Sequence, residues 1–349
     1  MMAANKGSES ALSNGDNPGT LGVPEVVHLL AGVHGEAVGI DQTFAKLKRA
    51  EFKRGNDTIL ATGLMVTLYV EEAHRPERRA ALAACFDDYW NAAGSELRWI
   101  SQPRGLAEDA IKYRWAQPSK QTIVRPAQWV FDLSEDHPWS VSAHGGASIT
   151  DASTYTFEIG SAGAWEHSLS FLSAAWPLGF FEGKPETFRA TVRKWIDRLQ
   201  PLHGYGGIGV LLPLDGAAAR RMAGEAFGLA MRFPGLELDA PVSHVNVLAN
   251  GIKGVNWLTA VGDRLLDKLG GGPAVLNRLD QRFEAHRYGA GLLIQAGRMP
   301  ELGDVHRHLV PEAYRDLSRM LAPLRAHFEY TMMRGISAEQ SAQWLSRFD

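Results

Sequence analysis

Two stretches organise the sequence: Gly251-Ile-Lys-Gly-Val-Asn-Trp257-Leu-Thr259 and Ala290-Gly-Leu-Leu-Ile-Gln295-Ala296. Both are rich in apolar and β-branched residues, so we predict two short strands, one ending near Thr259 and one over residues 290–296. We expect a helical segment between them. A Gly/Pro loop should follow the second strand, because Gly297, Pro300 and Gly303 come directly after it.

Four residues of this region could have a functional or a structural role. Trp257 and Gln295 could line a pocket. Their apolar neighbours favour the structural role, with Trp257 in the core and Gln295 satisfying buried backbone groups at a strand end. Gly303 and Asp304 belong to the following loop. We therefore treat Trp257, Gln295, Gly303 and Asp304 as a structural anchor stretch.

The order and spacing of these segments resemble a known family. The features that carry the resemblance are Gly254-Val-Asn-Trp257-Leu-Thr, Leu269-Gly-Gly, Ile294-Gln-Ala-Gly297 and Pro300-Glu-Leu-Gly303-Asp304, with a weaker likeness over residues 58–101. They resemble immunity proteins of type VI secretion systems that protect against VRR-Nuc and related restriction-endonuclease-like nuclease effectors. The resemblance implies a protein that binds and inhibits a cognate nuclease effector. The absence of catalytic motifs from the sequence favours a non-catalytic, cofactor-free protein.

The composition is typical of a folded soluble protein that buries a core. The 349 residues are 45% hydrophobic, and the net charge of −3 does not favour direct binding to nucleic acid, which needs a basic surface. The single Cys85 fits a reducing compartment. Residues 1–22 are polar and predict a disordered lead-in, and residues 23–349 predict one large domain with a possible sub-boundary near residue 240. The apolar run 168–181 is too short to span a bilayer, so we expect a cytoplasmic protein without a membrane partner.

Strands alternate with helices of uneven length along the chain, which predicts an α+β fold with a mixed β-sheet, packed helices and a helical C-terminus. Strand-helix-strand patterns at residues 58–101 and 168–212 suggest duplicated β-α-β units. Residues 128–133 read as a further strand, and 134–148 as an irregular segment. A capping-box pattern at Ser337 and Gln340 predicts the start of a C-terminal helix.

Gly204-Tyr-Gly206-Gly-Ile-Gly209 matches the dinucleotide-binding fingerprint in its letters. That fingerprint needs a strand before it and a helix after it, so that the pyrophosphate meets a helix N-terminus. Here a helix precedes and a strand follows. We interpret the glycines as a helix-to-strand turn.

Asp304, His306 and His308 alternate in sequence, so an extended segment would place them on one side, where they could hold a metal ion. A metal-dependent hydrolase using these residues is therefore an alternative function, and a structural or adaptor component of a secretion system is another. The competing interpretation is that Asp304 caps a turn and the histidines are exposed. Because the sequence has no familiar catalytic motif, we favour a protein that is not an enzyme.

The best candidate for partner binding lies in the segment after residue 133. Glu135, Asp136 and Trp139 place two carboxylates beside an aromatic residue on one predicted loop, near the predicted surface residues His137 and His144. A nuclease holds phosphates in a basic cleft, which such carboxylates could enter while the aromatic side chain anchors the contact.

Overall fold

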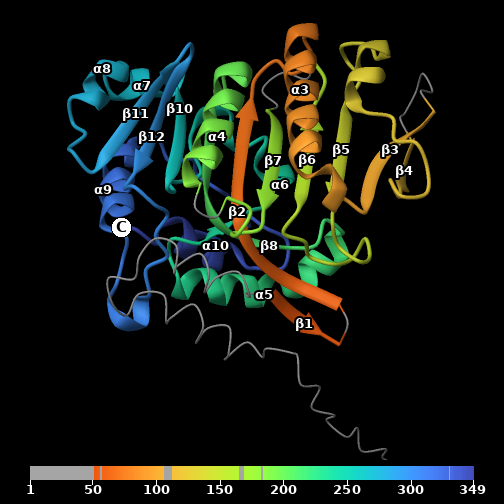
Figure 1. Ribbon diagram of the computed structural model, residues 1–349. Coiled ribbons are helices and arrows are strands. Elements are labelled where there is room, and N and C mark those ends of the chain that lie inside the picture. The colour runs from red at the N-terminus through yellow and green to blue at the C-terminus, as the bar shows by residue number, and fades with distance from the viewer. Residues whose placement is uncertain (1–50, 56, 106–111, 165–168, 182–183, 330) are drawn as a thin grey trace, which may run out of the picture.

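The computed structural model describes residues 51–349 except 56, 106–111, 165–168, 182–183 and 330. The predicted lead-in therefore lies outside the described residues. Within the described residues, the chain forms one twelve-stranded sheet in the order β11-β12-β10-β8-β2-β7-β6-β5-β3-β4, while β1 pairs with β2 and β9 with β8 (Figure 1). The helices pack around this sheet, as an α+β fold predicts.

The strands are β1 (Glu51–Arg54), β2 (Asp57–Val70), β3 (Trp99–Gly105), β4 (Lys112–Ala116), β5 (Trp139–His144), β6 (Thr156–Ser161), β7 (Ser170–Trp176), β8 (His203–Leu211), β9 (Glu237–Leu238), β10 (Leu258–Gly262), β11 (Phe283–Tyr288) and β12 (Gly291–Ala296). Among these described strands, every pairing is antiparallel except that of β8 with β9. The predicted mixed sheet is thus almost wholly antiparallel.

The helices are α3 (Pro76–Ala93), α4 (Pro185–Leu199), α5 (Gly216–Arg232), α6 (Pro241–His244), α7 (Asp263–Leu266), α8 (Gly271–Leu276), α9 (Glu312–Leu321) and α10 (Ala338–Leu345). Figure 1 shows α3 and α4 side by side in front of the sheet, with α5 along its lower edge. None of the helices in the described ranges combines the length and apolar character needed to cross a bilayer.

Strand β2 is the centre of the sheet because it pairs with β7 on one side and β8 on the other. Its two faces differ. Leu64 pairs with Trp176, whose ring packs against Tyr89 of α3 and Trp195 of α4. This side is an aromatic core, and burial of such rings is a main source of stability. Side chains at the odd positions of β2, including Thr67, point to the opposite face.

Several sequence predictions are confirmed: the buried strand at 58–70, the helices beginning at Pro76 and Pro185, and the capping box at Ser337. Cys85 is buried on α3, as its apolar neighbours predicted. The two predicted β-α-β units are present but differ, because three strands separate β2 from β3 whereas one separates β7 from β8. A duplication therefore stays a prediction.

Other predictions are wrong. Residues predicted as a strand at 128–133 form 3₁₀ turns, Pro126–Gln128 and Val130–Asp132. The segment predicted as irregular contains strand β5, and His144 at its end is fully buried. The glycines of 204–209 lie within β8 and make no turn. Between the two anchor strands the sequence prediction missed β11, which pairs with β12.

Candidate functional site

A row of polar side chains crosses the face of the sheet opposite to α3 and α4. In register from strand to strand it contains Ser142, Glu158, Ser173, Thr67 and Tyr205. Neighbours along the row are hydrogen-bonded: Ser142 Oγ donates to Glu158 Oε1 over 3.4 Å, and Thr67 Oγ1 lies 3.0 Å from Ser173 Oγ. We call this side the polar face. One face of the sheet is thus an apolar core, and the other carries hydrogen-bonding groups.

A buried ammonium group lies at one end of this row. Lys253 is 1% exposed, and its Nζ donates to Asp239 Oδ1 over 3.1 Å and to the Tyr205 hydroxyl over 2.9 Å. Glu237 Oε1 lies 2.7 Å from the same Nζ. Burial opposes the charged form of Asp239, but Lys253 and the hydroxyls of Thr67 and Tyr205 hold the pKa of this carboxyl below its ordinary value. The cluster is a paired charge network within the core.

Two buried histidines adjoin this network with fixed tautomers. His244 Nε2 donates to the Met332 carbonyl over 2.8 Å, so Nδ1 accepts from the Tyr69 hydroxyl over 3.0 Å. His203 donates from Nδ1 to the Ala260 carbonyl and accepts the Lys253 backbone N–H at Nε2. Burial lowers the pKa of His203 to about 4 and that of His244 to about 3. Both rings are therefore neutral at physiological pH.

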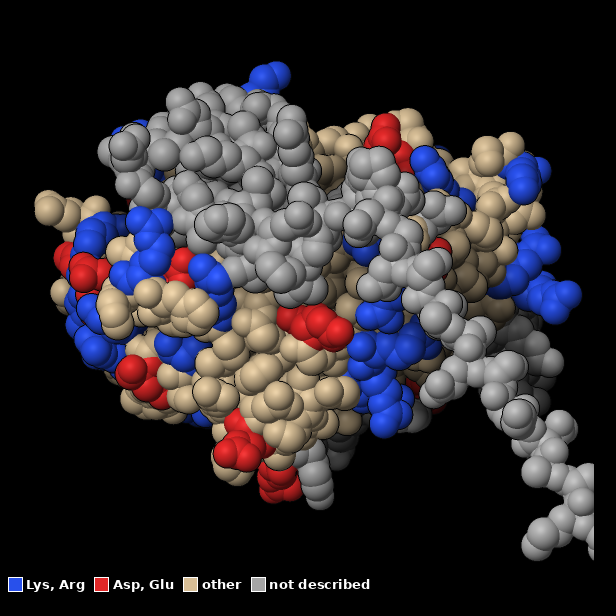
Figure 2. Space-filling view, turned by 90° about the horizontal axis from the view of Figure 1, so that it is seen from below, with Lys and Arg blue, Asp and Glu red and all other residues tan. Residues whose placement is uncertain are grey.

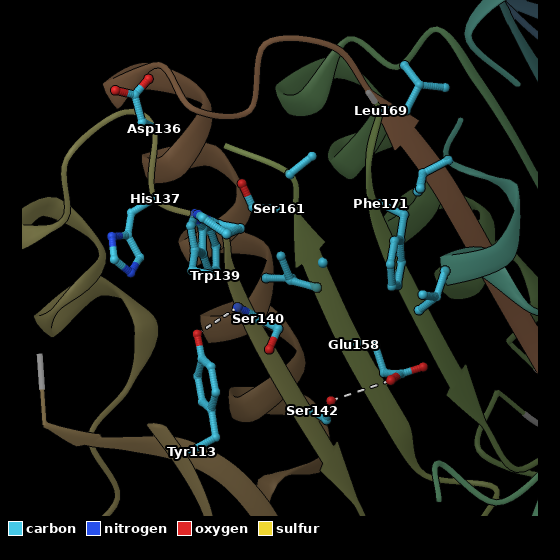
Figure 3. A pocket seen from close by; sticks show the side chains of 16 residues that line it. Tyr113, Asp136, His137, Trp139, Ser140, Ser142, Glu158, Ser161, Leu169 and Phe171 are labelled. Atoms are coloured by element: carbon cyan, nitrogen blue, oxygen red, sulfur yellow. Dashed lines mark hydrogen bonds between the residues drawn. The ribbon is translucent and has the colours of Figure 1, made fainter. Parts of the chain in front are cut away.

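A hollow of 910 Å³ opens on the polar face over β5, β6 and β7 (Figure 3). Ser142 and Glu158 lie on its floor, Phe171 of β7 forms one wall, and Val242 of α6 stands at the rim. Figure 3 shows Asp136 and His137 along the opposite side. A second hollow of 460 Å³, which reaches Asp239, shares Glu158 and Val242 with the first, so the two are adjacent. Glu158 is half-buried and lines both hollows, and burial raises the pKa of its carboxyl to about 7.

The predicted partner-binding residues are only partly brought together. Glu135 and Asp136 are exposed on the turn before β5. Trp139 begins β5, is 2% exposed, and packs edge-on against Trp129. The prediction that all of them share one loop is wrong for Trp139, because the alternation Trp139-Ser-Val141-Ser-Ala143 is that of a strand with one side in the core. The Trp139 side chain therefore lies in the core, whereas Asp136 lines the hollow.

Arg79 holds the turn that carries these carboxylates. Its guanidinium, on α3 and 3% exposed, donates to the backbone carbonyls of Val130, Leu133 and Ser134. Burial lowers the pKa of Arg79, and the nearby Glu135 acts in the opposite direction. The segment around Asp132, Glu135 and Asp136, which we call the acidic turn, is therefore tied to the body of the fold.

The anchor stretch is structural in the conformation observed. Trp257 is 1% exposed and donates from Nε1 to the Gly297 carbonyl, which also accepts from Gln295 Nε2. Gln295, 2% exposed, accepts from Arg189. Gly303 has φ +66°, and a Cβ there would lie 2.7 Å from the Leu309 carbonyl oxygen, so glycine is required.

Asp304, His306 and His308 do not converge. Asp304 is fully buried, caps the 3₁₀ turn Val305–Arg307 by accepting the His306 backbone N–H, and pairs with Arg232. Both histidine side chains are exposed. Among the described residues, no group of at least three His, Cys, Asp or Glu side chains could hold a metal ion. The geometry agrees with the turn-capping interpretation of Asp304.

The sequence analysis missed Glu158, Asp239 and Lys253. Glu158 had a detectable signal, because Thr156-Phe-Glu158-Ile-Gly alternates polar and apolar residues as a half-buried strand does. Lys253 and Asp239 had no such signal in the sequence, because only the fold brings them together. Seen from below, Lys and Arg gather in separate groups with Asp and Glu scattered among them (Figure 2). The described part of that side carries no continuous basic stripe.

Two comparisons with known proteins match most of the chain. Among curated proteins, none matches the chain. A solved structure of the Pseudomonas aeruginosa T6SS protein PA0821 superposes with a TM-score of 0.76 and 25% sequence identity, covering 84% of this chain and 83% of that one. A family described as type VI immunity for VRR-NUC matches residues 81–348, which confirms the resemblance noted from the sequence. The chain therefore belongs to the type VI immunity family for VRR-NUC.

Proposed function

We propose that this protein is an immunity protein that binds a cognate VRR-Nuc effector and blocks its activity in the cytoplasm of the producing cell. The observation that carries the proposal is the family match over residues 81–348. The protein acts by binding and has no catalytic role of its own. The buried Asp304 and the separated histidines supply no competing chemistry.

The acidic turn is the surface that we propose for this contact. Asp132, Glu135 and Asp136 are exposed within five residues of chain, and Phe131 beside them is 51% exposed. Nucleases need cationic side chains to hold phosphates, so carboxylates here would complement the effector's cleft and speed association. Phe131 takes the role of aromatic anchor that the sequence analysis assigned to Trp139.

Arg79 makes this surface suitable for tight binding. Its hydrogen bonds fix the backbone of the turn before any partner arrives, so less conformational entropy is lost on association. Replacing Arg79 with Lys should weaken binding through mobility, with the carboxylates all still present. Faster amide hydrogen exchange at residues 130–134 in this variant would report that mobility directly.

The function is tested by expressing the cognate effector with and without this chain. We expect this chain to restore survival and intact genomic DNA, and to form a complex on gel filtration. The triple variant Asp132→Asn/Glu135→Gln/Asp136→Asn should bind at least tenfold more weakly. The matched control is Glu225→Gln/Glu339→Gln, which neutralises exposed carboxylates on α5 and α10 and should bind normally.

Two outcomes would count against these statements. Absence of protection and of complex formation by the wild-type chain would reject the immunity function. Protection with unchanged affinity of the triple variant would keep the function and exclude the acidic turn.

A further inference from the structure

The hollow over β5, β6 and β7 is anionic. Its described lining residues include the carboxylates of Asp136 and Glu158 and no Lys or Arg. The other titratable groups around it are His137 and Tyr113, and the Tyr113 hydroxyl accepts the Ser140 backbone N–H over 2.9 Å. A cation entering this space meets no like charge on the described wall.

Glu158 is a carboxylate without a cationic partner among the described residues. Its carboxyl accepts the long hydrogen bond from Ser142, and the nearby Asp239 adds a repulsive charge. The raised pKa of Glu158, caused by burial and by that charge, is the expected consequence of an uncompensated site. Asp239, in contrast, has Lys253 beside it. Glu158 is thus the carboxylate on the floor of the hollow whose charge a cationic ligand would balance.

The walls are apolar, which selects among cations. Phe171 lies beside Glu158, and Val242 at the rim is 71% exposed, the most exposed of the large hydrophobic residues described. A side chain that ends in a cation and has a long aliphatic stem fits this arrangement, since the stem can cover the apolar wall while its head reaches the carboxylate. Lysine and arginine have this shape.

We propose that the hollow receives a lysine or arginine side chain of the bound effector, whose cation pairs with Glu158 while its aliphatic stem packs on Phe171 and Val242. The inference rests on the proposed function and deepens it. Asp136 belongs both to the acidic turn and to the wall of the hollow, so the two surfaces are continuous. The effector residue that enters would come from the phosphate-binding surface that the acidic turn covers.

The test compares Glu158→Gln with Glu225→Gln, an exposed control on α5. Glutamine keeps the size of the side chain and removes its charge, so the fold should survive; a second variant, Ser142→Leu, fills the floor of the hollow. We expect each of these two cavity variants to raise the Kd for the effector at least tenfold, and the control to leave it unchanged.

The pH dependence separates charge from shape. The cation needs ionised Glu158, so wild-type affinity should fall as the pH drops from 8 to 6, while Glu158→Gln should lack this component. Asp136, His137, Tyr113 and Asp239 also face the site, and Arg220 and Arg334 line the adjacent hollow. Because they are common to both proteins, the difference between the two pH profiles isolates Glu158.

A partner-independent arm uses arginine amide as the probe, titrated by NMR. Binding at millimolar concentration to the wild type and not to Glu158→Gln would support the site even if the effector does not bind, which would reject only the proposed function. Unchanged effector affinity in both cavity variants would overturn the inference and leave immunity intact. If neither the effector nor arginine amide binds the wild type, the inference is also overturned.

Discussion

At the scale of single residues, Lys253 carries a buried charge that its neighbours must balance. Its Nζ lies within 3.1 Å of Asp239 Oδ1 and 2.7 Å of Glu237 Oε1. Replacing Lys253 with Met leaves two buried carboxylates without this cation, so we expect a loss of about 3–5 kcal/mol in the free energy of unfolding. Chemical denaturation of the wild type and of Lys253→Met measures this loss.

The matched control is Lys194→Met. Lys194 also pairs with a carboxylate, that of Asp88, but its side chain is 55% exposed, so its removal should cost less than about 1 kcal/mol. Equal losses in the two variants would show that the Lys253 cluster is solvated and contributes no more than a surface pair.

The buried histidines predict a loss of stability in acid. The pKa of His203 is lowered to about 4 and that of His244 to about 3, from an ordinary value of about 6.5. Below pH 6.5 the unfolded chain therefore binds protons that the folded chain does not, so stability is complete above that pH and falls as the pH approaches 4. Each histidine contributes about 3 kcal/mol to this loss.

Denaturation midpoints measured between pH 7.5 and 4.5 check this prediction. His203→Asn keeps a donor for the Ala260 carbonyl but cannot take up a proton, so its profile should be shallower than that of the wild type. Glu158 contributes with the opposite sign, because its raised pKa favours the folded state as the pH falls below about 7. Glu158 is present in both proteins, so its contribution cancels when the two pH profiles are compared. Parallel profiles would contradict the assignment to His203.

At the scale of elements, the glycine-rich strand β8 depends on missing side chains. A Cβ on Gly207 would lie 2.1 Å from Asn256 Oδ1, and Asn256 cannot move freely because it donates to Glu237 and accepts the Trp257 N–H. We expect Gly207→Ala to destabilise the fold by about 1–3 kcal/mol. Gly228→Ala on α5, where nothing lies within 4 Å, should instead stabilise it by about 0.5–1 kcal/mol.

Thermal unfolding of the two glycine variants gives opposite shifts if this account of β8 is correct. A stabilised Gly207→Ala would mean that Asn256 can move aside without loss. The glycines of 204–209 serve close packing inside β8, so these dinucleotide-like letters do not form the strand-to-helix turn that the fingerprint needs.

The sequence predicted elements whose pattern is local. The apolar run of β2, the buried face of α3 and the capping box of α10 need few distant residues to be recognised. Residues 128–133 were predicted as a strand because Trp129, Val130 and Phe131 favour one. The carbonyls of Val130 and Leu133 instead accept hydrogen bonds from Arg79 of α3, so no neighbouring strand is needed there.

The candidate site was less predictable because it is made by strand register. Glu158, Ser173 and Thr67 become neighbours only when β6, β7 and β2 pair, and no spacing in the sequence announces that. Asp136 was predicted from local charge and does line the hollow. Phe131, and not Trp139, is the exposed aromatic residue of this region. Trp139 points from β5 into the core, whereas Phe131 points away from the core in its turn.

At the scale of the whole molecule, a net charge of −3 is too small to direct a partner by itself, so charge must act locally. On the side seen in Figure 2 the two signs are interspersed. The acidic turn and the hollow beside it concentrate carboxylates in one place, at Asp132, Glu135, Asp136 and Glu158. Association with a basic nuclease should therefore be steered to this region.

Stopped-flow or surface-plasmon kinetics of the effector complex test this steering. Raising the salt concentration from 0.05 to 0.5 M shortens the Debye length from roughly 14 to 4 Å, so exposed carboxylates should lose most of their influence on the association rate. We expect that rate to fall about tenfold or more for the wild type. The triple variant Asp132→Asn/Glu135→Gln/Asp136→Asn should start slower and depend less on salt.

Glu158→Gln should behave differently from that triple variant, because its charge lies on the floor of a hollow where salt screens it less. Its effect should be mainly on the dissociation rate, since a buried pair forms after encounter and must break before release. A slower association rate with unchanged dissociation in Glu158→Gln would place this carboxylate with the steering charges of the acidic turn, outside the bound contact.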